Sequence, residues 1–303
     1  YEKCNNYEIV SGKIFREKKN CANPYLIGLA REIRRFQPDI IHVMNELTSL
    51  VLFQGLIFRN LFRPRAKVLF WAQENLLDKK FRNGNLLKRL IWFYNAKNVD
   101  GGGYVNSEGI QQMRDLGFAT KNVVLSYWGI PADQYQKQNV EEMVERYNLK
   151  GRVKLGFVGR IAKEKGLLTV LEAMGRLPKS VVFIVVGRGE YLDELKQQVK
   201  ERDFRERFLY FDQVDDFEIA KYMSLFDVLV LPSVTTGAWK EQFGRVIAEA
   251  MFCGIPVVGS SSGAIPEVFQ GTGFIFKEGD AGDLANKITQ FLHLPDQEKE
   301  KMR

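Results

Sequence analysis

The feature that most constrains the fold is a regular alternation of short apolar runs with segments of helical spacing. In the second half of the chain, apolar runs of strand length begin at residues 153, 181, 207, 227, 255 and 273. Amphipathic segments separate the first four runs, at 166–177, 190–202 and 216–226. Strands that alternate with helices usually form a parallel sheet with helices packed on it. The sequence therefore predicts an α/β fold.

The first half shows the same rhythm, which predicts a second domain of similar architecture. Strands are predicted at 37–44, 67–73, 99–107 and 122–129, and helices at 23–36 and 107–117. A length of 303 residues is enough for two domains of ordinary size. A polar stretch from Gln134 to Arg152 separates the halves. We predict an N-terminal domain at 1–136, a linker at 137–152 and a C-terminal domain at 153–303.

Composition narrows the function classes. The chain is 45% hydrophobic and 27% charged and has no apolar run of membrane-spanning length, which indicates a globular protein without a membrane span. Only two histidines occur, His42 and His293, which argues against His-based metal sites and Ser-His-Asp triads. The chain has an odd number of cysteines at unrelated spacings, Cys4, Cys21 and Cys253, and no signal peptide at Tyr1. We therefore expect reduced thiols and a cytoplasmic location. A net charge of +7 favours a nucleotide, an acidic membrane or a nucleic acid as partner, and the chain has no recognised nucleic-acid motif.

The segment 240–258 predicts a loop, a short helix and a buried strand, and it carries two carboxylates. Glu241 precedes the helix and Glu249 lies more than a turn inside it. Eight residues of helix span roughly 12 Å, which suits the hexose and ribose ends of a nucleotide-sugar. The helix N-terminus between them favours an anion such as a diphosphate. The alternative is a pair of surface carboxylates beside an amphipathic helix.

Glu-x7-Glu within EQFGRVIAEAMFCGIPVV resembles the signature of retaining glycosyltransferases of family four, also called glycosyl transferases group 1. The resemblance covers about residues 37–292 and is strongest over 154–276. It implies a GT-B fold, with two Rossmann-like doubly wound domains and an interdomain cleft. It also implies that Glu241 is catalytic and contacts the donor sugar, while Glu249 binds the ribose. Nothing before Asn23 matches the family's opening strand and Gly-rich loop, and the family's final helices are not found, so we expect a trimmed fragment or a short member.

A second cluster lies in GFVGRIAKEKG, residues 156–166, between a predicted strand and a helix. In doubly wound folds such strand ends face the ligand crevice. The resemblance implies that Arg160 and Lys165, beside Gly159, bind the donor diphosphate and act in catalysis. Fixed cations stabilise the charge that develops on a leaving diphosphate. The alternative is two solvated loop cations.

Further donor-binding residues follow from the resemblance. Leu192 occupies the third glycine position of a G-x-G-x-x-G motif, which argues against a dinucleotide site. The resemblance implies that this loop lies beside the donor nucleotide, where Gly187 and Gly189 would let the backbone approach it. Gln213 and Val214 are expected near the base. The same donor site would include Phe243, Gly244 and Arg245. Three acidic residues lie at a turn between the strand predicted from 207 and the helix predicted at 216–226: Asp212, Asp215 and Asp216. Their negative charge complements the positive end of the helix dipole, which explains them better than a metal site does.

Residues on the donor-sugar or acceptor side are predicted from two loops. Small residues in SSSGAIPEVF, including Gly263 and Ala264, would leave backbone N–H groups free to face the donor sugar, unless the segment is a plain turn. Many family members place a His near the donor hexose, where this chain has Gln73 and Asn75. Either amide can hydrogen-bond a sugar hydroxyl.

Basic segments with aromatic residues in the first half predict a peripheral membrane contact. Residues 81–99 include Arg82, Lys88, Arg89 and Trp92, and residues 56–67 are similar. The alternative is ordinary helices packed on the sheet with snorkelling cations.

The resemblance, together with these residues, implies transfer of a hexose from a nucleoside diphosphate sugar to an acceptor hydroxyl. The resemblance alone implies that the transfer is retaining and that the acceptor is a glycan or a lipid-linked saccharide. We expect no metal and no cofactor, and a role in polysaccharide biosynthesis in the cytoplasm or on the cytoplasmic membrane face. The rival is an impaired or truncated relative that binds nucleotide-sugars as a binding or scaffold protein. As a loop residue, Glu241 is expected to matter for turnover more than for folding.

Overall fold

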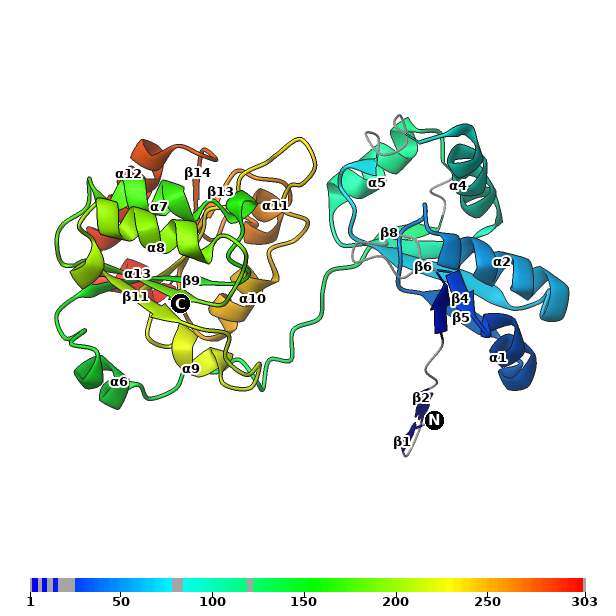
Figure 1. Cartoon of the computed structure of the whole chain (residues 1–303), viewed down its shortest axis with the longest axis horizontal. Helices are drawn as coiled ribbons and strands as arrows, with labels where there is room; N and C mark the ends of the chain where they lie inside the picture. Colours follow the sequence, from blue (N-terminus) through cyan, green and yellow to red (C-terminus); the bar gives the residue numbers. More distant parts are fainter. Residues whose placement is uncertain are drawn as a thin grey trace. The chain divides into compact units, whose positions relative to one another are not determined.

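The chain folds into two compact units, Tyr1–Tyr127 and Trp128–Arg303, each built around a parallel sheet (Figure 1). The coordinates are those of a computed structural model, which describes residues 2–4, 7–9, 13–15, 25–77, 84–118 and 122–301. The two units are described separately below.

The first unit holds a four-stranded parallel sheet in the order β5-β6-β7-β8, which confirms the four predicted strands. Its strands are β5 (Ile40–Val43), β6 (Lys67–Ala72), β7 (Gly101–Tyr104) and β8 (Val123–Leu125). Its helices are α1 (Leu29–Phe36), α2 (Leu50–Phe62), α4 (Leu86–Asn98) and α5 (Ser107–Asp115).

The helix predicted from Asn23 begins only at Leu29. Residues before it pair as short antiparallel ladders, β1 (Glu2–Cys4) with β2 (Tyr7–Ile9) and β3 (Lys13–Phe15) with β4 (Tyr25–Ile27). Gly28, with φ of 96°, separates β4 from α1. The sequence pattern did not predict this pairing, because β4 lies inside the segment predicted as a helix, 23–36, whereas its partner β3 lies before that segment.

The core of the first unit contains one residue that the sequence analysis assigned to a membrane surface. Trp92 is only 6% exposed and packs in the apolar cluster of the sheet, α2, α4 and α5, so that assignment is wrong. Two cations of segment 56–67 also have structural partners. Arg59 pairs with Asp100 at 3.4 Å, and Arg63 pairs with Asp39 at 2.9 Å. For these residues the structure supports the alternative of packed helices.

The second unit contains a six-stranded parallel sheet in the order β11-β10-β9-β12-β13-β14, which confirms all six predicted strands. In chain order this is 3-2-1-4-5-6, the order of a Rossmann fold, with its switch point between β9 and β12. The strands are β9 (Val153–Val158), β10 (Val181–Val186), β11 (Phe208–Phe211), β12 (Val228–Leu231), β13 (Val257–Ser260) and β14 (Phe274–Phe276).

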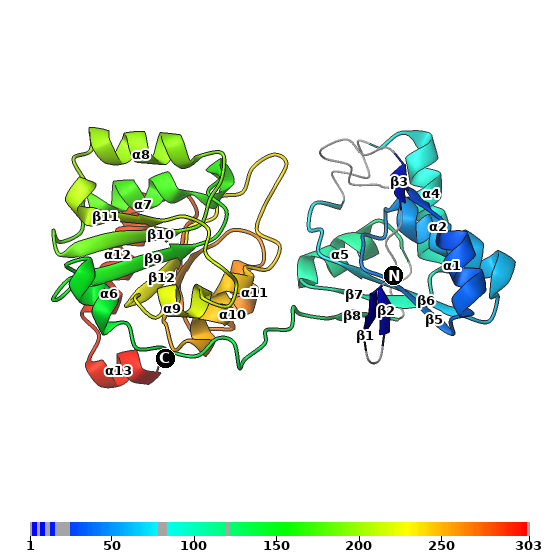
Figure 2. The same ribbon diagram turned by 60° about the horizontal axis from the view of Figure 1, so that its bottom comes forward.

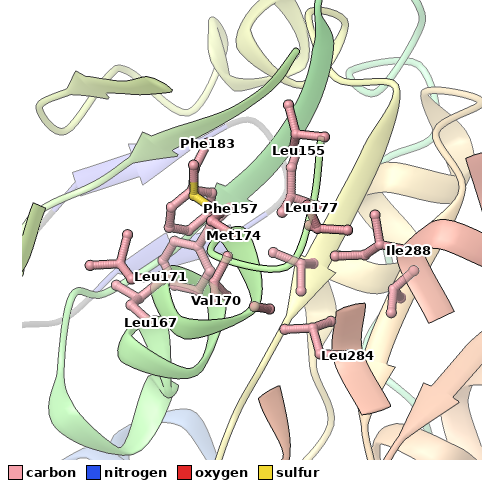
Figure 3. Close-up of a cluster of buried hydrophobic side chains, with 14 of the residues drawn as sticks. Leu155, Phe157, Leu167, Val170, Leu171, Met174, Leu177, Phe183, Leu284 and Ile288 are labelled. Carbon is pink, nitrogen blue, oxygen red and sulfur yellow. The ribbon is translucent and has the colours of Figure 1, made fainter. Parts of the chain in front are cut away.

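Helices cover both faces of this sheet, as Figure 2 shows. Phe183 belongs to the apolar cluster of α7, α8 and α12, and the next residue, Ile184, belongs to the cluster of α9, α10 and α11. Figure 3 shows the first cluster, in which residues of α7 and α12 meet β9 and β10. Burial on both faces explains why the strands are apolar throughout. The helices are α7 (Leu167–Met174), α8 (Leu192–Glu201), α9 (Ile219–Met223), α10 (Arg245–Phe252), α11 (Ile265–Phe269), α12 (Ala281–Leu292) and α13 (Asp296–Lys301).

The units divide between Tyr127 and Trp128, and the stretch interpreted as a linker, 137–152, packs on the second unit. It carries α6 (Glu141–Arg146), and Leu149 is 2% exposed in the cluster beside α9 and α10. Its few apolar residues recur at the spacing of one helix face, which a composition-based linker prediction does not detect.

Candidate functional site

A cavity of about 800 Å³ opens in the second unit where β9, β10 and β12 end. These strands flank the switch point, where open α/β sheets bind ligands. Most of the donor-site residues predicted from sequence line this one cavity: Gly159, Arg160, Lys165, Gly187, Gly189, Gln213, Val214, Glu241, Gly244, Arg245 and Glu249. The fold therefore gathers residues from several loops into one site.

The two predicted cations stand on the loop after β9, each with an acidic partner. Lys165, in the short 3-10 helix Lys163–Lys165, donates to Oε2 of Glu241 at 2.7 Å. Arg160 is half exposed and donates to Oε1 of Glu190 at 3.0 Å and to Glu164. Burial of the Glu164 carboxyl opposes its ionisation, but a hydrogen bond from its own N–H and the Arg160 guanidinium outweigh burial and lower its pKa. The half-exposed guanidinium is accessible to an anion in the cavity.

Trp239 forms a wall of the cavity beside these cations. The Lys165 Nζ lies 4.6 Å from the centroid of the indole ring, at cation–π distance. The turn that presents Trp239 is closed by Thr236, whose Oγ1 accepts from the Trp239 N–H at 3.0 Å and whose own N–H donates to the Trp239 carbonyl at 2.7 Å. The ammonium of Lys165 is therefore held between an aromatic face and a carboxylate.

Glu241 is buried, although it belongs to a loop. It is 7% exposed, and its Oε2 accepts from the Ser233 hydroxyl at 2.7 Å in addition to Lys165. The sequence analysis expected Glu241 to matter for turnover more than for folding because it is a loop residue. Since the side chain is buried and ion-paired, we expect its truncation to lower stability as well, by leaving the ammonium of Lys165 without this partner.

The backbone of Gly263 and Ala264 packs against the backbone of Glu241. The Ala264 N–H donates to the Glu241 carbonyl at 3.0 Å. Gly263 has φ of 53°, and a Cβ there would lie 2.0 Å from the same carbonyl oxygen, so only glycine fits. The Ala264 N–H thus faces the Glu241 backbone, whereas the sequence predicted N–H groups free for the donor sugar. Neither residue is among those that line the cavity.

Helix α10 starts at the cavity and places Glu249 one turn inside. Gly244 forms the N-cap with φ of 78°, and Phe243 before it is buried and does not line the cavity. Glu249 is 5% exposed, and its Oε1 lies 2.6 Å from the Arg245 Nε. Burial, followed by the Glu249 charge, raises the pKa of Tyr135 to about 12. The loop-helix-strand prediction for 240–258 is confirmed.

Gly187 and Gly189 line the cavity and also allow the β9 and β10 loops to pack together. A Cβ at Gly187 would lie 2.1 Å from the Gly159 oxygen, and one at Gly189 would lie 2.1 Å from the Ile161 oxygen. The Ile161 N–H donates to the Arg188 carbonyl at 2.9 Å across the same contact. Loop packing thus gives a structural reason for these glycines besides the predicted approach to a nucleotide.

Gln73 and Asn75 belong to the first unit and are not among the residues of this cavity. Gln73 is half-buried, and its N–H donates to Oε1 of Glu46 at 3.1 Å. Asn75 is 1% exposed, so Gln73 is the better placed of the two for a ligand. Their predicted contact with a sugar stays a prediction.

Several cavity residues were not predicted from sequence. Trp239 lies in the loop of Glu241. Ser233 does not line the cavity but donates to Glu241, and its position after β12 at the switch point could have indicated it. Arg188 lies between Gly187 and Gly189, lines the cavity and pairs with Asp212 at 3.1 Å. Tyr135 carries no local signal, because it lies in the polar stretch before α6.

The chain holds two Rossmann-like units, and in the second unit cations, carboxylates and a helix N-terminus surround a cavity at the switch point of the sheet. This architecture is that of a GT-B-like α/β protein. The sequence profile of the glycosyl transferases group 1 matches residues 139–303, more than half of the chain. The chain therefore belongs to the glycosyl transferases group 1 family, as the sequence motif indicated.

Named relatives are glycosyltransferases of varied specificity. The chain is 28% identical over 281 residues to N-acetyl-alpha-D-glucosaminyl L-malate synthase of Bacillus anthracis, covering 89% of this chain and 70% of the relative. It is 27% identical over 173 residues to the GDP-mannose-dependent alpha-(1-6)-phosphatidylinositol monomannoside mannosyltransferase of Mycobacterium tuberculosis, covering 54% of this chain and 45% of that protein.

Solved structures share the fold. Anabaena Alr3699/HepE in complex with UDP superposes with a TM-score of 0.78 at 21% identity, covering 90% of this chain and 74% of that one. Sucrose-phosphate synthase from Thermosynechococcus elongatus gives a TM-score of 0.72 at 21% identity, over 90% and 69% of the two chains.

No helix in the described part of the chain is both long and apolar enough to cross a membrane. The described residues also contain no group of three or more His, Cys, Asp or Glu side chains placed to hold a metal ion.

Proposed function

We propose that this protein transfers a hexose from a nucleoside diphosphate sugar to an acceptor hydroxyl of a glycan or a lipid-linked saccharide. The observation that carries the proposal is the cavity of the second unit. There Arg160, Lys165 and the start of α10 provide positive charge between two buried carboxylates, Glu241 and Glu249. A nucleotide-sugar has the complementary order: a hexose, an anionic diphosphate and a ribose.

The electrostatics suit departure of a diphosphate. Cleavage of the bond between the hexose and the nucleotide leaves negative charge on the β-phosphate, and prepositioned donors that face this charge lower the barrier. Arg160 supplies a planar fork and Lys165 a point charge. Lys165 is held in place by Glu241 and Trp239 before any ligand arrives, so little reorganisation is needed. In this proposal the leaving phosphate accepts the proton of the acceptor hydroxyl, the anomeric configuration is retained, and no metal is required.

Similar proteins support a nucleotide-sugar donor. Alr3699/HepE has been crystallised with UDP and with UDP-glucose, and the mycobacterial mannosyltransferase is named for its use of GDP-mannose. Both donors have the order of groups that the cavity would accommodate. The same comparisons motivate the choice of UDP- and GDP-sugars for the first experiments.

Product analysis after incubation with UDP- and GDP-hexoses and a set of glycan and lipid-linked acceptors tests the proposal. We expect one donor to be consumed, with a new glycosidic bond whose anomeric configuration, determined by NMR, matches that of the donor. Glu241→Gln, which keeps the shape of the side chain, serves as the matched inactive control. Nucleotide-sugar binding without product from any acceptor would favour the rival, a binding or scaffold protein. An inverted product would contradict retention.

We also propose that the first unit contacts an acidic membrane through the start of α4. Leu86, Leu87 and Leu90 are 73%, 66% and 57% exposed, and the exposed Lys88 and Arg89 lie between them. Leucines beside cations suit an interface of acyl chains and anionic headgroups. Arg82, from the original prediction, lies outside the described residues, and Trp92 is buried.

Sedimentation with vesicles tests this contact. We expect binding to vesicles with anionic lipid, weaker binding at high salt because salt screens the attraction, and loss of binding in Lys88→Glu/Arg89→Glu. Lys97→Glu, which changes an exposed cation near the other end of α4, is the control. Equal binding to neutral and anionic vesicles would contradict the proposal.

A further inference from the structure

The indole ring of Trp239 enters the cavity from an exposed loop, and the function proposed above gives it no contact with the ligand. Residues 235–238 are exposed, whereas Trp239 is half-buried and lines the cavity. It belongs to neither of the two apolar clusters of the second unit. The ring therefore contributes surface to the cavity and not to the core.

The loop that carries Trp239 is held by contacts to two other segments of the second unit. The Val234 N–H donates to the Glu164 carbonyl, on the loop after β9, at 2.8 Å. The Thr235 N–H donates to Oε2 of Glu278 at 2.6 Å. Together with the hydrogen bonds between Thr236 and Trp239 described above, these contacts define the position of the backbone from which the indole projects.

The indole presents two different groups to its surroundings, a face and an N–H. The centroid of the ring lies 4.6 Å from Nζ of Lys165, which also donates to Oε2 of Glu241 at 2.7 Å. The indole Nε1–H makes no hydrogen bond to a protein acceptor in the part of the chain that the structure describes. Indole N–H groups usually have an acceptor when they leave bulk water, and a ligand in the cavity would supply one.

A phosphate group complements both features of the ring. The Lys165 ammonium has three N–H donors, and Glu241 accepts one of them. Phosphate oxygens are acceptors, so one phosphate can accept from the ammonium and from the indole N–H on different oxygens. Hydrogen bonds to an ionised acceptor are roughly twice as strong as those between neutral groups, which favours a phosphate over a hexose hydroxyl as the acceptor.

We infer that Trp239 binds the donor diphosphate together with Lys165: the face of its indole holds the ammonium, and its indole N–H donates to an oxygen of the β-phosphate. The inference rests on the proposed function, which places a nucleoside diphosphate in this cavity. It adds a neutral donor to the two cations and assigns it to a residue outside both the Glu-x7-Glu motif and the segment of Arg160 and Lys165.

The test separates the N–H from the face of the ring. Trp239→Phe keeps an aromatic face and removes the N–H, whereas Trp239→Leu removes both. Calorimetric titration compares UDP with UMP and GDP with GMP, since only the diphosphates carry a β-phosphate. We expect Trp239→Phe to bind UDP or GDP about tenfold more weakly, because a hydrogen bond to a charged group is lost, and to bind the monophosphate almost as the wild type does.

Trp239→Leu should bind the diphosphate about twofold to tenfold more weakly still, because the cation–π contact with Lys165 is lost as well. In a Lys165→Ala background, Trp239→Phe and Trp239→Leu should bind alike, since no ammonium remains for the face to hold. Trp128→Phe is the matched control, because Trp128 is a half-buried tryptophan of the second unit that does not line the cavity. It should bind UDP and UMP as the wild type does, and circular dichroism confirms that each variant is folded.

An unchanged diphosphate affinity in Trp239→Phe, or an equal loss for the diphosphate and the monophosphate, would overturn the inference and leave the proposed function intact. The same holds if Trp239→Phe binds UDP normally and UDP-hexose weakly, because the ring would then contact the sugar. Failure of the wild-type chain to bind either diphosphate would overturn the proposed function itself, and the inference with it.

Discussion

Removal of the Glu241 carboxylate should affect both catalysis and folding, and the two effects can be separated. In the structure the side chains of Glu241 and Lys165 are 9% and 17% exposed, and their charged atoms lie 2.7 Å apart. Loss of one partner from a fully buried ion pair costs about 3–5 kcal/mol, because the other charge stays buried. Since Lys165 keeps some contact with solvent, we expect Glu241→Ala to lose about 2–3 kcal/mol of unfolding free energy.

For a unit of about 150–250 residues, each kcal/mol shifts Tm by about 2–4 °C. Thermal unfolding of Glu241→Ala should therefore show a Tm lower by about 5–10 °C for the second unit. Glu241→Gln retains an acceptor for Ser233 or Lys165 and should lose less. Glu241→Ala/Lys165→Ala should be less destabilised than the sum of the single variants, because no ammonium is left unpaired.

Catalysis is measured at a temperature where all variants are folded, as checked by circular dichroism. Both Glu241→Ala and Glu241→Gln should lower kcat/KM by at least about tenfold, or about 1.4 kcal/mol of transition-state stabilisation. Because Glu241→Gln is the more stable variant, a large loss of activity in it separates chemistry from folding. Wild-type kcat/KM in both variants would refute the role at the donor sugar. An unchanged Tm in Glu241→Ala would refute the stability argument.

The remaining predictions concern the diphosphate, metals and alkaline pH. Arg160→Ala and Lys165→Ala should each weaken UDP or GDP binding in calorimetric titration, and the effects of the two changes should not be additive in the double variant. The exposed Lys163→Ala should bind almost as wild type, and unchanged affinity in every variant would leave Arg160 and Lys165 with structural ion pairs alone. Turnover should survive excess chelator, and a loss that manganese or magnesium restores would contradict the metal-free mechanism. Burial, followed by the Glu249 charge, raises the pKa of the Cys253 thiol from 9.0 to about 11, so the folded state keeps a proton that the unfolded chain loses. The contribution of the protonated thiol to the free energy of unfolding is complete below about pH 9 and disappears as pH rises toward 11. In urea unfolding, the stability of Cys253→Ala should therefore fall less between pH 8 and pH 10 than that of the wild type, and an equal fall would contradict this prediction.

The sequence alone predicted the architecture and many of the residues that line the cavity of the second unit, because both depend on local patterns. Alternating apolar runs and helical segments identified both parallel sheets, and the strand ends located the loops of Arg160 and Gly187. The segment of Glu241 and Glu249 is contiguous, so its loop, helix and strand were predictable from spacing, capping and Pro256.

Only the tertiary structure decided the features that depend on distant residues. Burial of Glu241 results from Ser233 and Lys165, which are supplied by separate strand ends, and a loop sequence does not indicate burial. Trp92 lies in the core because the sheet and α2 cover it, although its neighbours resemble a membrane surface in composition. Tyr135 lines the cavity that Glu249 also lines, because a stretch that is polar in sequence packs on the second unit. Periodicity and motifs describe what a segment can form locally, whereas burial and ion pairing depend on which segments the fold brings together.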